Sequence, residues 1–132
     1  MLYDGLCGFC NGTVRFILAR DARGTMRFAP LQGELARGVL ARHPELAGVD
    51  SLVLVERDAV GGRERVWVRS GSVLEIARYL GGGWQVAGAL RLVPRALRDW
   101  GYDLFARFRY RLFGRFDSCP VPEPAARERF LL

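Results

Sequence analysis

The chain has 132 residues, of which 50% are hydrophobic and 26% charged, a composition typical of a folded domain and not of a disordered chain. No stretch reaches the roughly 20 apolar residues that a membrane-spanning helix needs. The net charge is +6, and all basic residues are arginines spread along the chain, so we interpret them as a solvated surface and do not expect nucleic-acid binding. Three cysteines, an odd number, argue against a disulfide scaffold. Because the first residues lack the basic and apolar segments of a signal peptide, we expect a cytoplasmic protein.

Strands and helices alternate along the first two thirds of the chain, as judged from hydrophobic spacing and turn residues. The last of these helices is expected to begin at Ser72, in a capping box with Glu75, and to bury Val73. The predicted elements, in order, are a strand at Met1–Tyr3, a helix at Gly8–Arg20, a strand at Met26–Ala29, a helix at Glu34–Arg42, a strand at Ser51–Glu56, a loop at Asp58–Gly62, a strand at Arg65–Arg69 and a helix from Ser72 to Gly81.

The order β-α-β-α-β-β-α predicts an α/β fold with a thioredoxin-like sheet. Strand–helix–strand units imply parallel pairing, and the hairpin adds an antiparallel edge. We expect residues 1–83 to form this core and residues 84–132 to form a C-terminal helical extension packed on it, as one domain overall.

The extension contains an apolar stripe with helical spacing, beside a stripe of arginines. The first interpretation is a helix that packs its apolar stripe on the core and leaves the arginines solvated. The alternative is a helix that lies on a membrane surface, so peripheral membrane contact through this segment is a second hypothesis. The two stripes are Leu104, Phe108, Leu112 and Phe116, and Arg107, Arg111 and Arg115.

Two cysteines three positions apart, Cys7 and Cys10 in the sequence CGFC, follow the first predicted strand. Cys7 would stand at the start of the first helix, where free backbone N–H groups favour a thiolate. Cys10 would lie one turn further, with its sulfur close enough to bond to that of Cys7. We therefore predict a thiol-disulfide oxidoreductase in which Cys7, on an exposed lip, attacks a protein or small-thiol disulfide and Cys10 resolves the mixed disulfide. Gly8 would let a partner chain approach. This chemistry needs no cofactor.

Asp4 precedes Cys7 by three residues, and two roles are open for it. It could accept the proton of Cys10 during resolution. It could instead shape the Asp4-Gly5 turn or cap the helix.

A metal-binding module, for zinc or an iron-sulfur cluster, is the alternative interpretation of the cysteine pair together with Cys119. Cys7, Cys10, Cys119 and His43 could together supply the ligands of a zinc site. Against it, Cys119 has no second cysteine at knuckle spacing, and His43, before Pro44, is typical of a helix end. An inert, buried pair of cysteines is the third interpretation.

The sequence resembles the DCC-type thiol-disulfide oxidoreductases, a family named after an Asp-x-x-Cys-x-x-Cys motif. Here the motif is Asp4, Cys7 and Cys10, and the resemblance covers nearly the whole chain. It implies a thioredoxin-like fold and a thiol-disulfide activity. The other segments that carry it are Val14–Phe16, Arg20-Asp21, Phe28–Gln32, Val68–Ser70, Arg109–Gly114 and Cys119-Pro120.

The chain departs from the related patterns in three places. The first strand is shorter than is usual in the family, and Ser70-Gly71-Ser72 stands where Ser-x-Ala is typical. Thioredoxins place a proline before the third strand, whereas this chain has Val49-Asp50-Ser51. In thioredoxins this proline keeps metals away from the cysteines. Its absence here therefore favours binding of a metal or cluster at the cysteines.

Overall fold

A four-stranded mixed sheet lies at the centre of the computed structural model, which describes residues 1–49, 52–117 and 123–131. Its strands are β1 (Leu2–Tyr3), β2 (Ala29–Pro30), β3 (Val53–Arg57) and β4 (Glu64–Val68). Their order is β2-β1-β3-β4, with β1 parallel to β2 and antiparallel to β3, and with β3 and β4 forming an antiparallel hairpin. This α/β arrangement confirms the predicted thioredoxin-like fold class. The parallel pairing expected of strand–helix–strand units holds for β1 and β2 but is wrong for the second unit, because β3 runs antiparallel to β1 and does not pair with β2.

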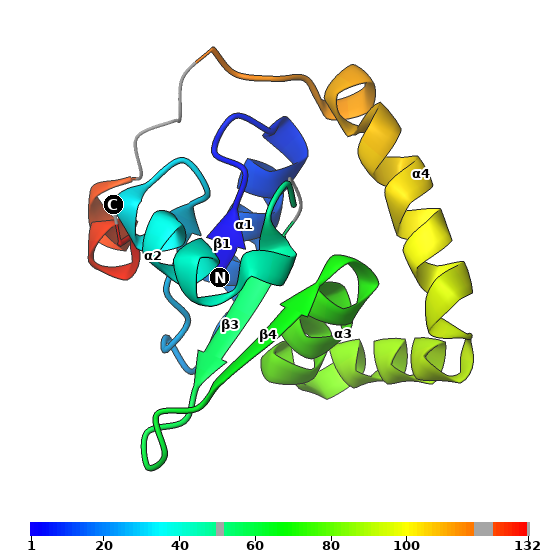
Figure 1. The fold of residues 1–132 in the computed structure, drawn as a ribbon, viewed down its shortest axis with the longest axis horizontal. Helices are drawn as coiled ribbons and strands as arrows, with labels where there is room; N and C mark the ends of the chain where they lie inside the picture. Colours follow the sequence, from blue (N-terminus) through cyan, green and yellow to red (C-terminus); the bar gives the residue numbers. More distant parts are fainter. Residues whose placement is uncertain (50–51, 118–122, 132) are drawn as a thin grey trace.

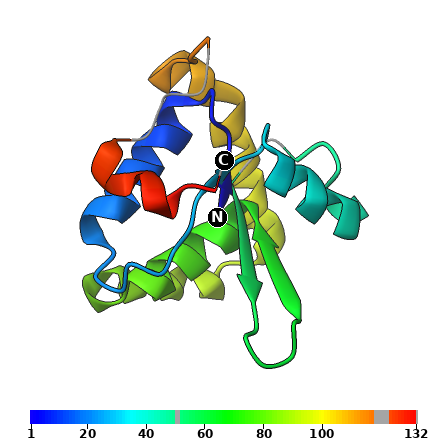
Figure 2. The same cartoon turned by 90° about the vertical axis from the view of Figure 1, so that its left-hand side faces the viewer.

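Helices cover both faces of the sheet (Figures 1 and 2). The core on one face contains Val14 and Ile17 of α1 with Ile76 of α3, and the core on the other face contains Ala36 and Val39 of α2. The helices are α1 (Gly8–Arg20), α2 (Glu34–Arg42), α3 (Arg69–Leu80) and α4 (Arg95–Phe113), with shorter 3-10 segments η1 (Pro44–Leu46), η2 (Gly82–Leu92) and η3 (Pro124–Arg129).

The C-terminal part of the chain returns to the core at two places. The helix α4 packs against α1 and α3, and Tyr110 of this helix touches the core cluster that contains Cys7 and Cys10. Beyond it, Phe130 packs against the rings of Tyr3 and Phe28. Residues distant in sequence therefore surround the start of α1.

Several predicted boundaries agree with the structure, whereas those of the four strands and the start of α3 differ from it. The helices α1 and α2 have the predicted bounds, and Gly81, with φ of +68°, ends α3 as expected. Strand β2 begins at Ala29, later than Met26.

The helix α3 begins at Arg69 and not at Ser72. The chain turns directly from β4 into the helix through Arg69, whose φ is +54°. The hydroxyl of Ser72 donates to the carbonyl of Arg69 at 2.7 Å, so Ser72 is a buried residue inside the helix and does not cap it. Leu74 is buried and Val73 is exposed, contrary to the predicted core.

The packed face of α4 also differs from the prediction. Leu104, Phe108, Leu112 and Phe116 are all more than 40% exposed, whereas Arg109 is buried. The prediction assumed that the apolar stripe marks the inward face, but an ionic partner for Arg109 inside the protein sets a different rotation of the helix. Within the described parts of the chain, no helix combines the length and hydropathy needed to cross a membrane.

Candidate active site

Cys7 is the N-cap residue of α1. Its backbone is extended, with φ of −86° and ψ of 122°, and its sulfur accepts the backbone N–H of Cys10 at 3.4 Å. Both residues are free thiols. The predicted placement is therefore confirmed: the helix begins at Gly8, the Cys7 sulfur faces its first turn, and Cys10 lies beside it. Amide groups in this position stabilise a negative charge.

Both sulfur-bearing side chains are sealed from solvent. Cys7 is 0% and Cys10 1% exposed. The expectation that Cys7 lies on an exposed lip is therefore wrong. The burial has a long-range cause, which a short motif does not contain: residues from the far end of α4 lie across the start of α1.

The covering segment is Phe113–Phe116, called the strap below. It runs past the start of α1 immediately after α4 ends (Figure 1). The N–H of Gly8 donates to the carbonyl of Gly114 at 3.2 Å, and the N–H of Phe116 donates to the carbonyl of Leu6 at 2.7 Å. These bonds place Arg115 opposite Cys7 in an antiparallel bridge.

Gly8 is required by this close approach. A Cβ atom on Gly8 would lie 2.2 Å from the carbonyl oxygen of Phe113, far inside van der Waals contact. The approach of a partner chain, which was predicted for Gly8, stays a prediction; in this structure the chain beside Gly8 is the protein's own strap.

Asp4 is buried directly before the cysteine turn and is hydrogen-bonded through both carboxylate oxygens. Oδ1 accepts from the N–H of Leu6 at 3.0 Å and from the side-chain amide of Gln32 at 2.9 Å. Oδ2 accepts from the hydroxyl of Tyr110 and lies 3.5 Å from the guanidinium of Arg109. The bond to Leu6 is the one expected of a turn-shaping aspartate.

The surroundings of Asp4 keep it ionised. Burial alone would raise its pKa, but the hydrogen bonds from Tyr110, Leu6 and Gln32, together with the charge of Arg109, outweigh burial and lower the pKa of Asp4 from its usual value. Burial and the bond to Asp4 in turn raise the pKa of Tyr110, so the phenol stays protonated as the donor.

Arg109 places a positive charge inside the protein near the cysteines. The residue is 2% exposed, and its guanidinium also donates to the Tyr110 hydroxyl at 3.0 Å. A buried arginine needs an anionic partner, which Asp4 supplies. The charge of Arg109 also favours the thiolate form of Cys10.

Two amide side chains hold the remaining parts of the turn. The side-chain N–H₂ of Asn11 donates to the carbonyls of Gly5 and Cys7, both at 2.9 Å. The side-chain oxygen of Gln32 accepts the N–H of Gly5 at 3.3 Å. The turn is thus held from α1, from the segment after β2, and from α4.

The surroundings of Cys10 hold the proton on its thiol. Burial, followed by the hydrogen bond and the charge of Cys7, raises the pKa of Cys10 to about 12, against the opposing effects of Arg109 and the Asp4 backbone. A thiol with this pKa is a hydrogen-bond donor to Cys7 and not a free thiolate at neutral pH.

The proposed zinc ligands do not meet in the described structure. Both ring nitrogens of His43 are taken by glutamates, Glu45 at 3.1 Å and Glu64 at 3.0 Å, so His43 is not a ligand beside Cys7 and Cys10. Cys119, like Asp50 and Ser51, lies outside the described residues. Among those described, no three His, Cys, Asp or Glu side chains are grouped to hold a metal ion.

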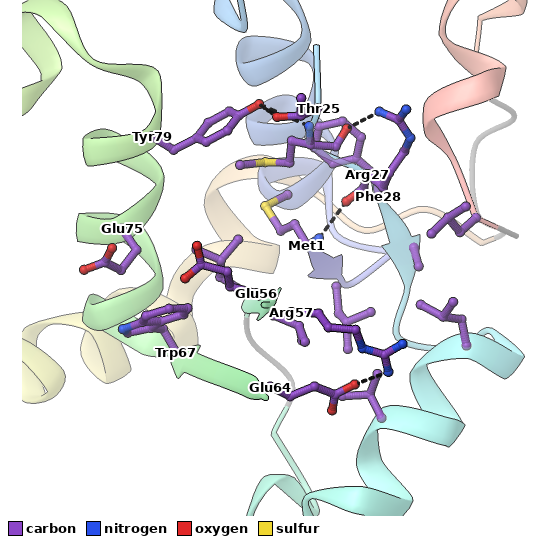
Figure 3. A pocket seen from close by; sticks show the side chains of 18 of the residues that line it. Met1, Thr25, Arg27, Phe28, Glu56, Arg57, Glu64, Trp67, Glu75 and Tyr79 are labelled. Carbon is purple, nitrogen blue, oxygen red and sulfur yellow. Dashed lines mark hydrogen bonds and ion pairs between the residues drawn. The ribbon is translucent and has the colours of Figure 1, made fainter. Parts of the chain in front are cut away.

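A separate cavity of about 880 Å³ lies at the other end of β1 (Figure 3). Met1, Trp67 and Tyr79 line it, and the amine of Met1 donates to the carbonyl of Arg27 at 2.6 Å. Neither cysteine is among its lining residues, so the cavity is not part of the cysteine site.

Comparison with known proteins identifies the family of this chain. Residues 1–115 match the family described as DCC1-like thiol-disulfide oxidoreductase. The chain belongs to this family. The protein YuxK of Bacillus subtilis, itself uncharacterised, is 33% identical over 132 residues, which cover 99% of this chain and 92% of that protein. The chloroplastic DCC family protein At1g52590 of Arabidopsis thaliana is 38% identical over 123 residues, which cover 92% of this chain and 68% of that protein. No solved structure matches the chain.

Four residues of this DCC1-like site had no role in the sequence analysis: Asn11, Gln32, Arg109 and Tyr110. A signal for three of them was present, since Phe28–Gln32 and Arg109–Gly114 are among the segments that resemble the family. The resemblance marked these segments without showing that they converge on Asp4. The spacing of Asn11 four residues after Cys7 gave no such signal.

Proposed function

We propose that this protein is a thiol-disulfide oxidoreductase with Cys7 as the nucleophile and Cys10 as the resolving thiol. The observation that carries the proposal is the position of the Cys7 sulfur at the N-cap of α1, where it accepts the N–H of Cys10. The raised pKa of Cys10 supports the same assignment, because a thiol that keeps its proton is not the attacking thiolate. Membership of a family described by this activity supports it further.

The exchange proceeds in two steps. The Cys7 thiolate attacks one sulfur of a substrate disulfide, the substrate S–S bond breaks, and the released thiolate takes a proton. Cys10 then loses its proton and attacks the Cys7 sulfur of the mixed disulfide, which releases the second substrate thiol and leaves a Cys7–Cys10 disulfide. The substrate gains two electrons, the protein loses two, and a reduced low-molecular-weight thiol or a dithiol protein restores the starting state.

Asp4 is proposed as a positioning residue in this reaction. Its lowered pKa makes it a weak base, and both of its oxygens already accept hydrogen bonds. Its proposed role is to fix the turn before Cys7 and to hold Arg109 near the thiols. In this arrangement, the proton of Cys10 leaves to solvent or to the departing thiolate once the site opens.

Trapping the mixed disulfide tests the assignment of the two cysteines. The Cys10→Ser variant should accumulate a covalent adduct with a disulfide substrate, because nothing resolves it, whereas Cys7→Ser should form none. Cys119→Ser should be present in both variants, so that the third thiol does not contribute. Equal turnover by the wild type and Cys7→Ser would contradict the proposal.

We propose the cytoplasm as the location, since a reducing compartment keeps such a pair in the dithiol form. We also propose that α4 contacts anionic membranes. Leu97, Trp100 and Leu104 are exposed on α4, with Phe108 and Leu112 further along the same face. Arg107 and Arg111 lie beside them and complement anionic lipid headgroups.

Vesicle cosedimentation tests the membrane contact. Binding to anionic vesicles should exceed binding to neutral vesicles and should weaken as salt is added. Trp100→Glu together with Leu104→Glu should abolish it. Retained binding in this variant, or concentration-dependent dimers in place of vesicle binding, would contradict the proposal.

A further inference from the structure

The strap pairs with residues 6–8 and lies directly beside Cys7, the proposed nucleophile. We propose that the strap imitates an extended polypeptide substrate and that such a substrate replaces it by pairing with residues 6–8. This inference rests on the proposed function and adds the substrate class: a cysteine within an extended polypeptide segment, in preference to a small disulfide.

The pairing geometry places one strap residue where a substrate cysteine would react. The two bonds that join Gly8 to Gly114 and Phe116 to Leu6 flank the pair Cys7 and Arg115, which exchange no backbone bond with each other. Such non-hydrogen-bonded antiparallel pairs bring the two Cα atoms within about 4.5 Å and their side chains closest together. That separation lies within the range that a disulfide bridges.

The backbone groups of Cys7 are engaged within its own turn and helix. Its N–H donates to the carbonyl of Asp4 at 3.2 Å, and its carbonyl accepts the backbone N–H of Asn11 at 3.0 Å. A chain opposite Cys7 therefore pairs through the carbonyl of Leu6 and the N–H of Gly8, as the strap does. A polypeptide can reproduce both bonds, whereas a small disulfide has less backbone with which to displace the strap.

The side chains of the strap are only partly packed, as expected of a segment that a substrate replaces. Phe113 is 50% and Phe116 45% exposed, and Arg115 is also exposed. The ring of Phe113 packs on that of Phe9, with centroids 5.1 Å apart. Gly114, with φ of +79°, marks the point where the strap leaves α4. Lifting the strap from this point exposes Cys7 and leaves the core beneath α1 in place.

The strap hydrogen bond can be removed selectively. Phe116→Pro loses the N–H that donates to Leu6, whereas the matched control Phe116→Ala keeps this N–H and loses only the ring. In a Cys119→Ser background, we expect Cys7 in Phe116→Pro to be alkylated about 3–10-fold faster than in Phe116→Ala, the range expected for one hydrogen bond. Equal rates in the two variants would overturn the covering role of the strap.

A second pair of variants distinguishes alkylation through strap opening from alkylation through global unfolding. Phe113→Ala removes the contact with Phe9 and should also speed alkylation of Cys7, whereas Leu112→Ala, on the exposed neighbouring position, should not. The rates are compared under native conditions with the unfolding rate of each variant. Alkylation that always follows the unfolding rate would overturn the proposal.

The substrate preference tests whether the strap imitates a polypeptide substrate. The wild type should reduce an unstructured peptide carrying a mixed disulfide faster than it reduces glutathione disulfide. Phe116→Pro should lower the ratio of these two rates, because it speeds the reduction of glutathione disulfide. A wild type that prefers glutathione disulfide, or an unchanged ratio in Phe116→Pro, would overturn the assigned substrate class. Turnover that persists in Cys7→Ser would instead reject the proposed function itself.

Discussion

The hydroxyl of Tyr110 donates a hydrogen bond to the buried carboxylate of Asp4, across 106 positions of the sequence. This bond joins α4 to the turn that carries Cys7. The same carboxylate lies 3.5 Å from the guanidinium of Arg109. One aspartate therefore fixes the C-terminal helix, the turn and a buried positive charge relative to one another.

A double-mutant cycle measures this bond. Tyr110→Phe should lower the free energy of unfolding by about 1.5–3 kcal/mol, as expected for a hydrogen bond to a charged group. After Asp4→Asn, the same Tyr110→Phe change should have a clearly smaller effect, because the ionised acceptor is already gone. Urea unfolding of the four proteins checks this, and additive effects would contradict the coupling.

Removal of the Arg109 charge should disturb both folding and the thiols. Arg109→Gln leaves the Asp4 carboxylate buried without its cation, and we expect a loss of about 3–5 kcal/mol in the free energy of unfolding. The apparent pKa of the dithiol should rise, since the Arg109 charge favours the thiolate of Cys10. Thiolate absorbance against pH measures this shift.

Two controls distinguish the charge of Arg109 from its bulk. Arg109→Lys should restore most of the shift in the titration curve. Arg107→Gln, on the exposed side of the same helix, should change neither quantity. A titration curve unchanged in Arg109→Gln would show that Arg109 acts on stability alone.

Gly8 and Gly12 offer a matched pair within α1. Gly8→Ala should destabilise the protein and speed alkylation of Cys7, because the new Cβ would overlap the carbonyl oxygen of Phe113 at 2.2 Å. Gly12→Ala meets no atom within 4 Å and should stabilise the helix by up to about 1 kcal/mol. Thermal unfolding and alkylation of both variants check this, and similar behaviour would contradict the close approach of the strap.

Acid should weaken the fold through Asp4 and Asp21. Burial opposes ionisation of Asp21, but bonds from Tyr79, Gly24 and Arg129 outweigh it and lower the pKa of its carboxyl group. Both folded-state pKa values are thus depressed. Their contribution to stability is therefore present above the usual carboxyl pKa of about 4 and is lost as the pH falls through the lower folded-state values.

Chemical unfolding between neutral and acidic pH measures this loss, and Asp21→Asn should flatten the curve. Asn retains some of the hydrogen bonds but has no proton to gain in this range. An unchanged pH dependence in Asp21→Asn would show that Asp21 does not contribute to acid sensitivity.

The features that the sequence predicted correctly are those determined by local sequence patterns. The bounds of α1 and α2, the order of helices and strands along the chain, and the placement of Cys7 at a helix start all depend on spacing and turn residues within a few positions. The burial of Cys7 depends on Arg115, and that of Arg109 on Asp4, each more than 100 positions away. A periodic pattern holds no information on such pairs.

The rotation of α4 shows the same limit. The stripe from Leu104 to Leu112 is as periodic as a core stripe, yet it faces outward. The contacts of Phe105 with Phe9 and of Arg109 with Asp4 select the other face. Sequence spacing identified an amphipathic helix, but the identity of its inner face depends on groups from the opposite end of the chain.

The two faces of α4 have a structural consequence. Its inner face holds Arg109 and Tyr110 against the cysteine turn, its outer face presents Trp100 and Phe108 to the surroundings, and its end continues directly into the strap. One helix therefore joins an exposed apolar surface to the segment that covers the Cys7 sulfur. A ligand of the outer face, whether a lipid surface or a protein, would bind the same helix whose end continues into the cover of Cys7.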